Sequence, residues 1–334
     1  MTTILVTSRS FGGGRADLVT DLVGRGHHLV RGPSDHQLDA LVEPLAAADA
    51  WIAGTGPVTA AHLDAGPGLR VVARYGVGFD AVDVAAATSR GIAVTNTPGA
   101  NTEAVADHAV GLMLAALRKT VAGDRRVRQG EWDVVERGHE LGALTVGIVG
   151  FGRIGRGVAA RLGGFGSVVL ATDPMLTADE LEAAGVSAAS FDELAARCDL
   201  VTLHAPGGRT LVDERWLGRL ARPPVLVNTA RADLVDEPAL ATALREGRVA
   251  AYAADTLSDS SSARSPLLDP ALADRVTVTP HAGAQTWEAV DAMGRGAVEN
   301  VLAVLAGRRP PNLVNTWSPD PAGHPPARDE RSGS

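Results

Sequence analysis

Two short valine-rich runs of this chain, each expected to form a strand, lead directly to side chains that could catalyse a reaction at a carbonyl group. Residues 225–228 precede Arg231, and residues 276–279 precede His281. An arginine guanidinium can form two parallel hydrogen bonds with a carboxylate. A histidine can exchange a proton with a carbonyl oxygen near neutral pH. Taken alone, Arg231 is equally consistent with a surface ion pair. Most single histidines are structural, so His281 taken alone favours a structural role.

A third apolar run, 71–73, is followed by a glycine-rich turn with the sequence RYGVG. Consecutive N–H groups in such a turn can bind an anion, and open α/β sheets bind ligands at the carboxyl ends of their strands. We therefore interpret Arg74, Gly76, Val77 and Gly78 as candidate substrate-binding residues. The alternative is an ordinary connection between a strand and a helix.

The stretch around residue 150 has the spacing of a dinucleotide-binding turn. An apolar run, 145–149, leads into Gly150-x-Gly152-x-x-Gly155, and apolar residues then continue at helical spacing. In such a turn the first glycine permits the tight bend and the second lets the pyrophosphate approach the backbone. The third lets the helix pack on the strand. The N-terminus of the helix offers unpaired N–H groups to the phosphates.

An acidic residue stands where this motif requires one. The apolar run 168–171 ends at Asp173, and a carboxylate about 20 residues after the glycines suits the hydroxyl groups of the adenosine ribose. A carboxylate there repels a 2′-phosphate, so the pattern favours NAD over NADP as the cofactor.

The elements that must position these residues alternate between strands and helices, which predicts an α/β fold. We expect strands at 4–7, 50–53, 71–73, 92–95, 145–149, 168–171, 200–203, 225–228, 251–254 and 276–279. We expect helices at 15–24, 38–48, 103–117, 193–197, 239–246 and 286–305.

The composition is that of a globular protein and excludes several functional classes. The chain of 334 residues carries a net charge of −8 and shows no large basic cluster, so neither nucleic acid nor an anionic membrane is expected as its partner. No apolar run approaches the roughly 20 residues that span a bilayer. The single cysteine, Cys198, is typical of a reducing compartment, and we expect a cytoplasmic protein.

The sequence resembles the D-2-hydroxyacid dehydrogenases, in particular the phosphoglycerate dehydrogenase-like branch without an added regulatory domain. Six segments carry the resemblance, in family order between about residue 70 and residue 285: RYGVGFDAVD, VTNTPGANTEAVADHAVGLML, TVGIVGFGRIG, LHAP, VNTARADLVDEPAL and TPHAG.

The resemblance implies an α/β fold of two Rossmann-like domains, each a parallel sheet flanked by helices, with the active site in the inter-domain cleft. Residues 1–99 with 284–317 would form the substrate-binding domain, and residues 100–283 the NAD-binding domain. A disordered tail is expected at 318–334, which is rich in proline, charged and small residues.

The resemblance also assigns roles to individual residues. Arg231 would hold the substrate carboxylate and polarise the carbonyl, His281 would be the acid/base, and the N–H groups of the 76–78 turn would bind the carboxylate. Asp255 would face the nicotinamide side of the cofactor pocket. The full set of expected cofactor-binding residues is Gly150, Gly152, Arg153, Ile154, Gly155, Asp173, His204, Ala205, Pro206, Thr229, Ala230, Asp255, His281 and Gly283. No metal site is expected.

The sequence departs from the family at one position that bears on catalysis. The family usually has a glutamate that pairs with the catalytic histidine, and the corresponding position here is Ser260. Asp259 stands one place earlier, and we treat it as a candidate catalytic residue in place of that glutamate. A second, milder change is Ala232, where the family normally has glycine after the arginine.

These observations predict an NAD-dependent oxidoreductase that transfers a hydride between nicotinamide and C2 of a 2-hydroxy or 2-oxo acid. Arg74 and Arg9 would suit a substrate with a second anionic group, such as a phosphate, phosphonate or carboxylate. The alternatives are a catalytically weak NAD(H)-sensing protein of the same fold and a dehydrogenase of the formate or phosphite type. By the family resemblance we expect a homodimer that contacts a small-molecule substrate.

Overall fold

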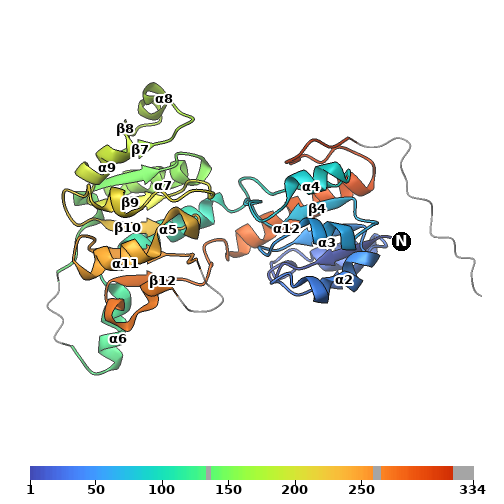
Figure 1. Ribbon diagram of the computed structural model, residues 1–334, viewed down its shortest axis with the longest axis horizontal. Coiled ribbons are helices and arrows are strands. Elements are labelled where there is room, and N and C mark those ends of the chain that lie inside the picture. The colour runs from blue at the N-terminus through green and yellow to red at the C-terminus, as the bar shows by residue number, and fades with distance from the viewer. Residues whose placement is uncertain (133–136, 259–264, 319–334) are drawn as a thin grey trace, which may run out of the picture. The chain divides into compact units, whose positions relative to one another are not determined.

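The chain divides into two compact α/β units. The structure, a computed structural model, describes residues 1–132, 137–258 and 265–318. Unit 1 comprises Met1–Asn101 together with the chain from Gln285 onward, and unit 2 comprises Thr102–Ala284. The elements of both units are labelled in Figure 1.

Unit 1 is built on a parallel sheet of five short strands in the order β2-β1-β3-β4-β5. The central strands β3 and β4 are buried along their whole length, as expected where helices cover both faces of a parallel sheet. The strands are β1 (Thr3–Val6), β2 (His28–Arg31), β3 (Ala50–Ala53), β4 (Val71–Arg74) and β5 (Ala93–Thr95).

Helices cover both faces of this sheet. The long helix α12 (Trp287–Leu305) contacts β3, β4 and β5, and α1 (Leu18–Gly24) packs beside it. Three helices contribute buried apolar side chains to a core that they share with the strands: α2 (Leu38–Ala47), α3 (Ala60–Ala65) and α4 (Val84–Ser89). After α12, Leu313 forms an antiparallel bridge with Thr95 at the end of β5.

Unit 2 contains a parallel sheet of seven strands in the order β12-β11-β10-β9-β6-β7-β8. Strands β6 and β9 lie side by side at the point where the strand order reverses, which is where open α/β sheets bind ligands. The strands are β6 (Thr145–Val149), β7 (Val168–Thr172), β8 (Ser187–Ala188), β9 (Leu200–Leu203), β10 (Val225–Asn228), β11 (Ala251–Ala254) and β12 (Val276–Val278).

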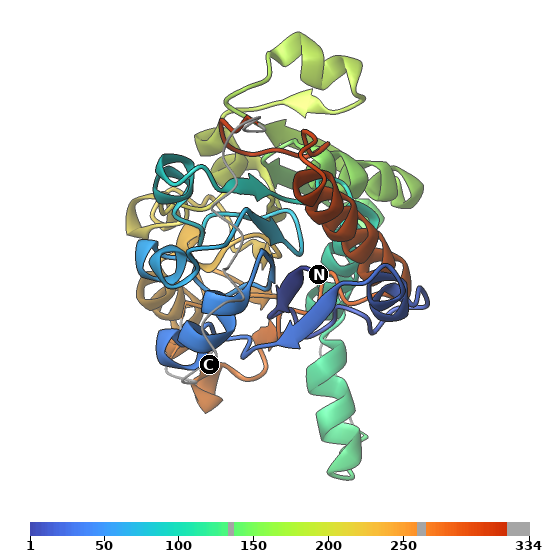
Figure 2. The ribbon, with the colours of Figure 1, turned by 90° about the vertical axis from the view of Figure 1, so that its right-hand side faces the viewer.

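The sheet of unit 2 separates two apolar cores. One core includes side chains of α5 (Thr102–Leu117), α7 (Arg153–Phe165) and α8 (Ala178–Ala183). The other includes α9 (Phe191–Arg197), α10 (Glu214–Leu217) and α11 (Glu237–Arg245). Helix α6 (Thr120–Arg128) projects from its unit, as Figure 2 shows. Single turns of 3-10 helix occur at Leu141–Ala143, Ala232–Leu234, Pro266–Leu268 and Pro270–Leu272.

The predicted fold class, α/β with two Rossmann-like domains, is confirmed. The units meet at residues 101/102 and 284/285; the binding roles predicted for the two domains stay predictions here. The sequence patterns did not predict the short strands β2 and β8 or the helices α3, α4, α6, α8 and α10. The tail predicted at 318–334 lies outside the described residues except for Ser318.

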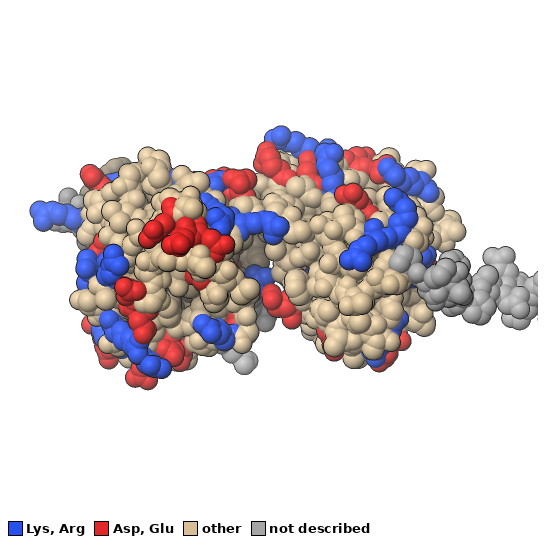
Figure 3. Space-filling view, turned by 90° about the horizontal axis from the view of Figure 1, so that it is seen from above, with Lys and Arg blue, Asp and Glu red and all other residues tan. Residues whose placement is uncertain are grey.

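The surface carries charges of both signs, in keeping with the ordinary composition. Figure 3 shows one face of each unit, and basic and acidic side chains are interspersed on it. Within the described ranges, no helix has the length and apolar character needed to cross a membrane.

A buried histidine, His36, links several segments of unit 1. Its Nε2 accepts a hydrogen bond from the hydroxyl of Thr7 (2.6 Å), and its Nδ1 donates to the carbonyl of Pro57 (2.9 Å). The ring lies 4.9 Å from the ring of Trp51, and only 2% of the residue is exposed. Burial, together with the nearby positive charge of Arg74, lowers the pKa of His36 from 6.5 to about 4, although the bond to Pro57 opposes this shift.

We expect His36 to make the protein less stable in mild acid. Between pH 6.5 and 4 an unfolded His36 binds a proton and the folded one does not, so the free energy of unfolding falls as the pH falls. From pH 7 to pH 5 this amounts to about 2 kcal/mol. In urea unfolding of the wild type and His36→Gln, the variant should lack that part of the loss. His28→Gln, at an exposed position of β2, should keep it. An equal pH dependence of His36→Gln and wild type would contradict the prediction.

Candidate functional site

The first glycine of the candidate nucleotide turn is required for two physical reasons. Gly150 follows β6 with a φ of +89°, a conformation that other residues rarely adopt. A Cβ added there would lie 2.7 Å from the carbonyl carbon and oxygen of His204. The backbone of this turn therefore lies directly against the chain that leaves β9.

The other two glycines differ in what surrounds them. A Cβ on Gly155 would lie 2.2 Å from the carbonyl oxygen of Gly150, so the helix packs tightly on the turn. A Cβ on Gly152 would have no atom within 4 Å. Gly152 is the N-cap of α7, and the N–H groups of the first helical turn, which includes Arg153 and Ile154, have no acceptors within the helix. The turn thus leaves open space and unpaired donors together, as a pyrophosphate requires.

Asp173 at the end of β7 is tied to this turn. Its Oδ2 accepts a hydrogen bond from the N–H of Phe151 (2.8 Å), and its Oδ1 accepts one from the N–H of Met175 (2.9 Å). Each carboxylate oxygen has a second lone pair, so Asp173 can still accept from a ligand hydroxyl. The carboxylate also lines a cavity of about 270 Å³ together with Thr172, Leu176, Ser190 and Glu193, among others.

The chain that leaves β9 contributes a neutral histidine. Burial lowers the pKa of His204 to about 4, so the ring is uncharged near neutral pH. Its Nε2 lies 3.0 Å from the hydroxyl oxygen of Thr202, whereas its Nδ1 is buried and has no partner among the described residues. The predicted contact residues Ala205 and Pro206 follow it directly. A buried nitrogen without a partner beside the glycine turn is consistent with a site that a cofactor completes.

The turn that presents Arg231 is held by a buried asparagine at the end of β10. Asn228 accepts a hydrogen bond from the N–H of Ala230 (3.0 Å) and donates one to the carbonyl of Arg231 (2.8 Å). Arg231 is half-buried and donates to the carbonyl of Ala230 (2.8 Å). The hydroxyl of Thr229 is buried with no partner in the described part of the chain. Ala232 has a negative φ, so the turn accommodates the alanine.

The candidate acid/base, His281, is exposed and has an unusual backbone conformation. Its φ is +55°, in the left-handed region, and its N–H donates to the carbonyl of Thr279 (2.9 Å). In the family a glutamate pairs with this histidine, and the present chain has Ser260 at that position and Asp259 one place earlier. Both residues lie outside the described residues.

Asp255 follows β11 and binds the backbone next to His281. Its carboxylate is 4% exposed and accepts hydrogen bonds from the N–H groups of Ala282 (2.8 Å) and Gly283 (2.7 Å). Burial alone would raise the pKa of Asp255, but the hydrogen bonds from His108, Thr279 and the two N–H groups outweigh it and lower the pKa. The carboxylate is therefore ionised near neutral pH.

In unit 1 the predicted anion-binding turn leaves two N–H groups open. The carbonyl of Val77 accepts a hydrogen bond from Asn96 (2.8 Å), and the carbonyl of Gly78 accepts one from Arg74 (3.2 Å). Gly76 has a φ of +133°, and its N–H donates to Thr97 (3.2 Å). The N–H groups of Val77 and Gly78 have no acceptor among the described residues, so these two donors are the candidates for binding a carboxylate.

The two arginines considered for a second anionic group differ in accessibility. Arg74 is 5% exposed and also donates to the carbonyl of Gly56 (3.1 Å). Arg9 follows β1, is exposed, and donates through Nε to the hydroxyl of Ser34 (2.6 Å). Arg74 thus shapes the turn, and its predicted contact with substrate stays a prediction, whereas Arg9 presents a guanidinium to solvent.

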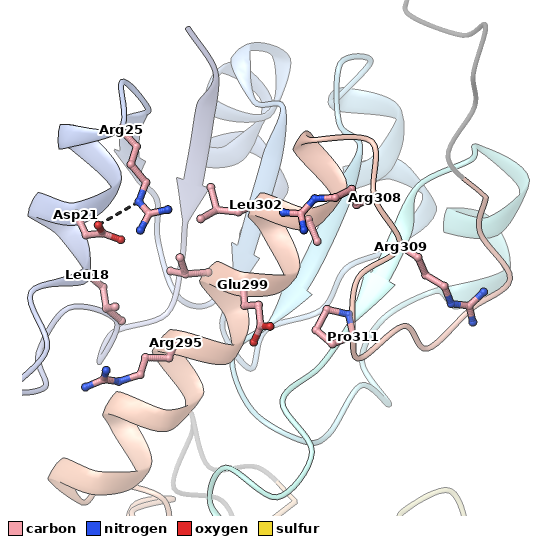
Figure 4. Close-up of a pocket in the computed structure, with 11 residues that line it drawn as sticks. Leu18, Asp21, Arg25, Arg295, Glu299, Leu302, Arg308, Arg309 and Pro311 are labelled. Carbon is pink, nitrogen blue, oxygen red and sulfur yellow. Dashed lines mark hydrogen bonds and ion pairs between the residues drawn. The ribbon is translucent and has the colours of Figure 1, made fainter.

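A larger cavity of about 560 Å³ lies elsewhere in unit 1, between α1 and α12. Figure 4 shows Arg25 and Arg308 on either side of Leu302 there, with Arg25 bonded to Asp21. None of the residues assigned to catalysis or cofactor binding lines this cavity. Within the described ranges, no three His, Cys, Asp or Glu side chains come together as a metal site would require.

The residues that support the site were not predicted from the sequence. Asn96, Thr97 and Asn228 fix the turns described above, and His108 contacts Asp255 from helix α5. The asparagines directly follow or end predicted strands, which is the one local signal that could have identified them. His108 lies within helix α5, where a single histidine has no local signal of a role at the site.

Comparison with known proteins places the chain in a family. Residues 110–283 match the model of the D-isomer specific 2-hydroxyacid dehydrogenase, NAD binding domain. The chain is 42% identical over 262 residues to D-3-phosphoglycerate dehydrogenase of Mycobacterium leprae (strain TN), an alignment that covers 77% of this chain and 49% of that protein. It is 40% identical over 270 residues to glyoxylate reductase of Korarchaeum cryptofilum (strain OPF8), covering 78% and 80% respectively.

A solved structure of similar fold contains the expected cofactor. The NAD-dependent formate dehydrogenase from Staphylococcus aureus in complex with NAD superposes with a TM-score of 0.82 at 30% identity, covering 95% of this chain and 100% of that one. The chain belongs to the D-isomer specific 2-hydroxyacid dehydrogenase family and carries its NAD-binding domain. It spans about half the length of the phosphoglycerate dehydrogenases that it matches. The predicted family and the predicted cofactor, NAD, are confirmed.

We expect Gly155→Ala to weaken NADH binding and to destabilise unit 2. The added Cβ would lie 2.2 Å from the Gly150 carbonyl oxygen, so α7 must move away from the turn. Overpacking of this kind costs about 1–3 kcal/mol, and we expect the NADH dissociation constant to rise at least about tenfold, equivalent to 1.4 kcal/mol. NADH fluorescence titration and thermal unfolding measure the two effects.

The matched control lies in the same helix. A Cβ on Gly164 would have no atom within 4 Å, so Gly164→Ala should leave NADH binding unchanged and raise stability by up to about 1 kcal/mol. Equal NADH affinity of Gly155→Ala and Gly164→Ala would show that α7 does not need its close approach to the turn.

Proposed function

We propose that this protein is an NAD-dependent oxidoreductase that transfers a hydride between nicotinamide and C2 of a 2-hydroxy or 2-oxo acid. The observation that carries the proposal is the placement of Arg231 and His281 after β10 and β12, in the same sheet whose β6 leads into the nucleotide turn. All strands of this sheet are parallel, so these groups and the turn belong to one edge of it.

Each group would have a distinct task on the substrate. Arg231 would bind the carboxylate through its guanidinium and polarise the C2 carbonyl. The N–H groups of Val77 and Gly78 would bind the carboxylate as well. In the direction of reduction, His281 would donate its proton to the C2 oxygen, leaving a neutral imidazole and a 2-hydroxy acid. Bound NADH would supply the hydride that C2 receives.

We further propose a substrate with a second anionic group and assign its recognition to Arg9. Arg9 follows β1, two strands from β4 and its turn in the sheet of unit 1, and its Nε is held by Ser34. The similarity to phosphoglycerate dehydrogenases, whose name denotes a phosphorylated substrate, favours this reading.

We also propose a cytoplasmic homodimer. Helix α6 projects from unit 2, and Val121 and Trp132 at and after this helix are 49% and 76% exposed, so we take them as candidate interface residues. The single cysteine, Cys198, is free and buried, and burial raises the pKa of its thiol to about 12. A protein without disulfides suits a reducing compartment.

The proposed activity is tested by a substrate panel with one catalytic variant. Purified protein should oxidise NADH with at least one of a set of mono- and dianionic 2-oxo acids. His281→Ala should lower kcat by about 10²–10⁴-fold because a proton donor is lost. His139→Ala, at an exposed position of the same unit, should retain full activity.

The same panel separates the alternatives. Oxidation of formate or phosphite with NAD⁺, in the absence of turnover with any 2-oxo acid, would replace the proposal with a dehydrogenase of that type. Tight NADH binding without turnover of any compound would favour an NAD(H)-sensing protein. Full activity of His281→Ala would remove His281 from the mechanism.

The role of Arg9 predicts a selective change in substrate affinity. Arg9→Gln should raise KM for a dianionic 2-oxo acid by about 10- to 100-fold, since a hydrogen bond between charged groups contributes roughly 1.5–3 kcal/mol. KM for pyruvate should change little. Arg25→Gln is the control, because Arg25 follows α1 and pairs with Asp21. A parallel rise of both KM values in Arg9→Gln would contradict recognition of a second anionic group.

A further inference from the structure

The backbone at His281 needs support from its surroundings. A positive φ of +55° is uncommon for a residue with a side chain, and such conformations persist where neighbouring groups hold them in place. The direction of the imidazole depends on this backbone, so whatever holds the backbone also sets where His281 presents its proton.

The support comes from Asp255. One carboxylate oxygen, Oδ1, accepts from the N–H of Ala282 at 2.8 Å, and the other, Oδ2, accepts from the N–H of Gly283 at 2.7 Å. These are the two residues that directly follow His281. Hydrogen bonds to an ionised carboxylate are about twice as strong as neutral ones. There is also little room for adjustment, because a Cβ on Gly283 would lie 2.9 Å from Oδ2.

Asp255 is itself held by two side chains. The hydroxyl of Thr279 donates to Oδ1 of Asp255, and Nε2 of His108 lies 3.3 Å from the same oxygen. Nε2 also lies 2.9 Å from the Thr279 hydroxyl oxygen. Because the Thr279 proton is directed to the carboxylate, Nε2 must carry the hydrogen that it shares with these two oxygens.

We propose that His108 is a positioning residue for His281 and that it acts through Asp255 and Thr279. The inference rests on the proposed function of His281. His108 has its place in helix α5, whose buried residues Ala106, Ala109 and Val110 pack in the core of unit 2. It therefore links a rigid helix to the turn that carries the acid/base. A leucine at this position would fill much of the same space but would withdraw the donor from both oxygens.

The experiment compares two substitutions of His108. His108→Leu should lower kcat by about 10- to 100-fold, as expected for a displaced catalytic group, with KM and the NADH dissociation constant nearly unchanged. His108→Gln retains an N–H donor of similar reach, and we expect it to restore most of the lost kcat. His139→Leu is the matched control for the loss of a histidine in unit 2.

A second readout does not depend on activity. Backbone amide hydrogen exchange at Ala282 and Gly283 should become at least about tenfold faster in His108→Leu, equivalent to 1.4 kcal/mol, and should stay near wild type in His108→Gln. Thr279→Val, which removes a hydroxyl and keeps the shape of the side chain, should produce the same changes if His108→Leu does not fold.

The outcomes separate this inference from the proposed function. If the wild type turns over no substrate, the proposed function fails, and the exchange measurement alone decides whether His108 holds the turn. Unchanged kcat and unchanged exchange in a folded His108→Leu would overturn the inference. A lower melting temperature with equal kcat in both variants would assign His108 to packing and overturn it as well.

Discussion

The parallel order of the strands is the constraint on which the candidate site depends. All strands of a parallel sheet end at the same edge, so residues that follow different strands are brought together there. In unit 2 this order gathers the glycine turn after β6, Asp173 after β7, His204 after β9 and Arg231 after β10. The sheet therefore brings together residues that are not near one another in the sequence. It assembles one candidate site from segments that lie as far apart in the sequence as Gly150 and Arg231.

This constraint also explains why the fold class was predictable and why candidate site residues could be named from the sequence. Strand β10 is buried along its whole length, and its first three residues, 225–227, are all apolar. The position of the strand and its carboxyl end can therefore be recognised in the sequence. Gly150 could be recognised in the sequence because its positive φ and its contact with His204 require a residue without a side chain. Predictions of this kind depend on one strand and the few residues that follow it, and the sequence contains that information.

The partners of the functional side chains were not predictable for the converse reason. His108 and Thr279 are 171 residues apart, and neither has a local signal that names the other. Arg74 follows a predicted strand just as Arg231 does, and no local pattern distinguishes the two arginines. In the structure Arg74 is buried and bonded to the carbonyls of Gly56 and Gly78, whereas Arg231 is half-buried. Burial depends on the packing of the whole unit, so two equivalent patterns acquired different environments.

Both units nevertheless use polar side chains to set the shape of the turns that follow their strands. A turn that offers its N–H groups to a ligand needs a fixed shape, and hydrogen bonds to its backbone help to hold that shape. Asn96 and Arg74 bind the carbonyls of the turn after β4, and Asn228 binds both a carbonyl and an N–H group of the turn after β10. Asp255 does the reverse, binding two N–H groups after His281 with a carboxylate. In each case hydrogen bonds from a polar side chain to the backbone help to set the turn, and a buried group with an unmet hydrogen bond would cost about 1–3 kcal/mol. The polar residues that bind the backbone of a turn therefore help to decide which of its groups remain available to a ligand.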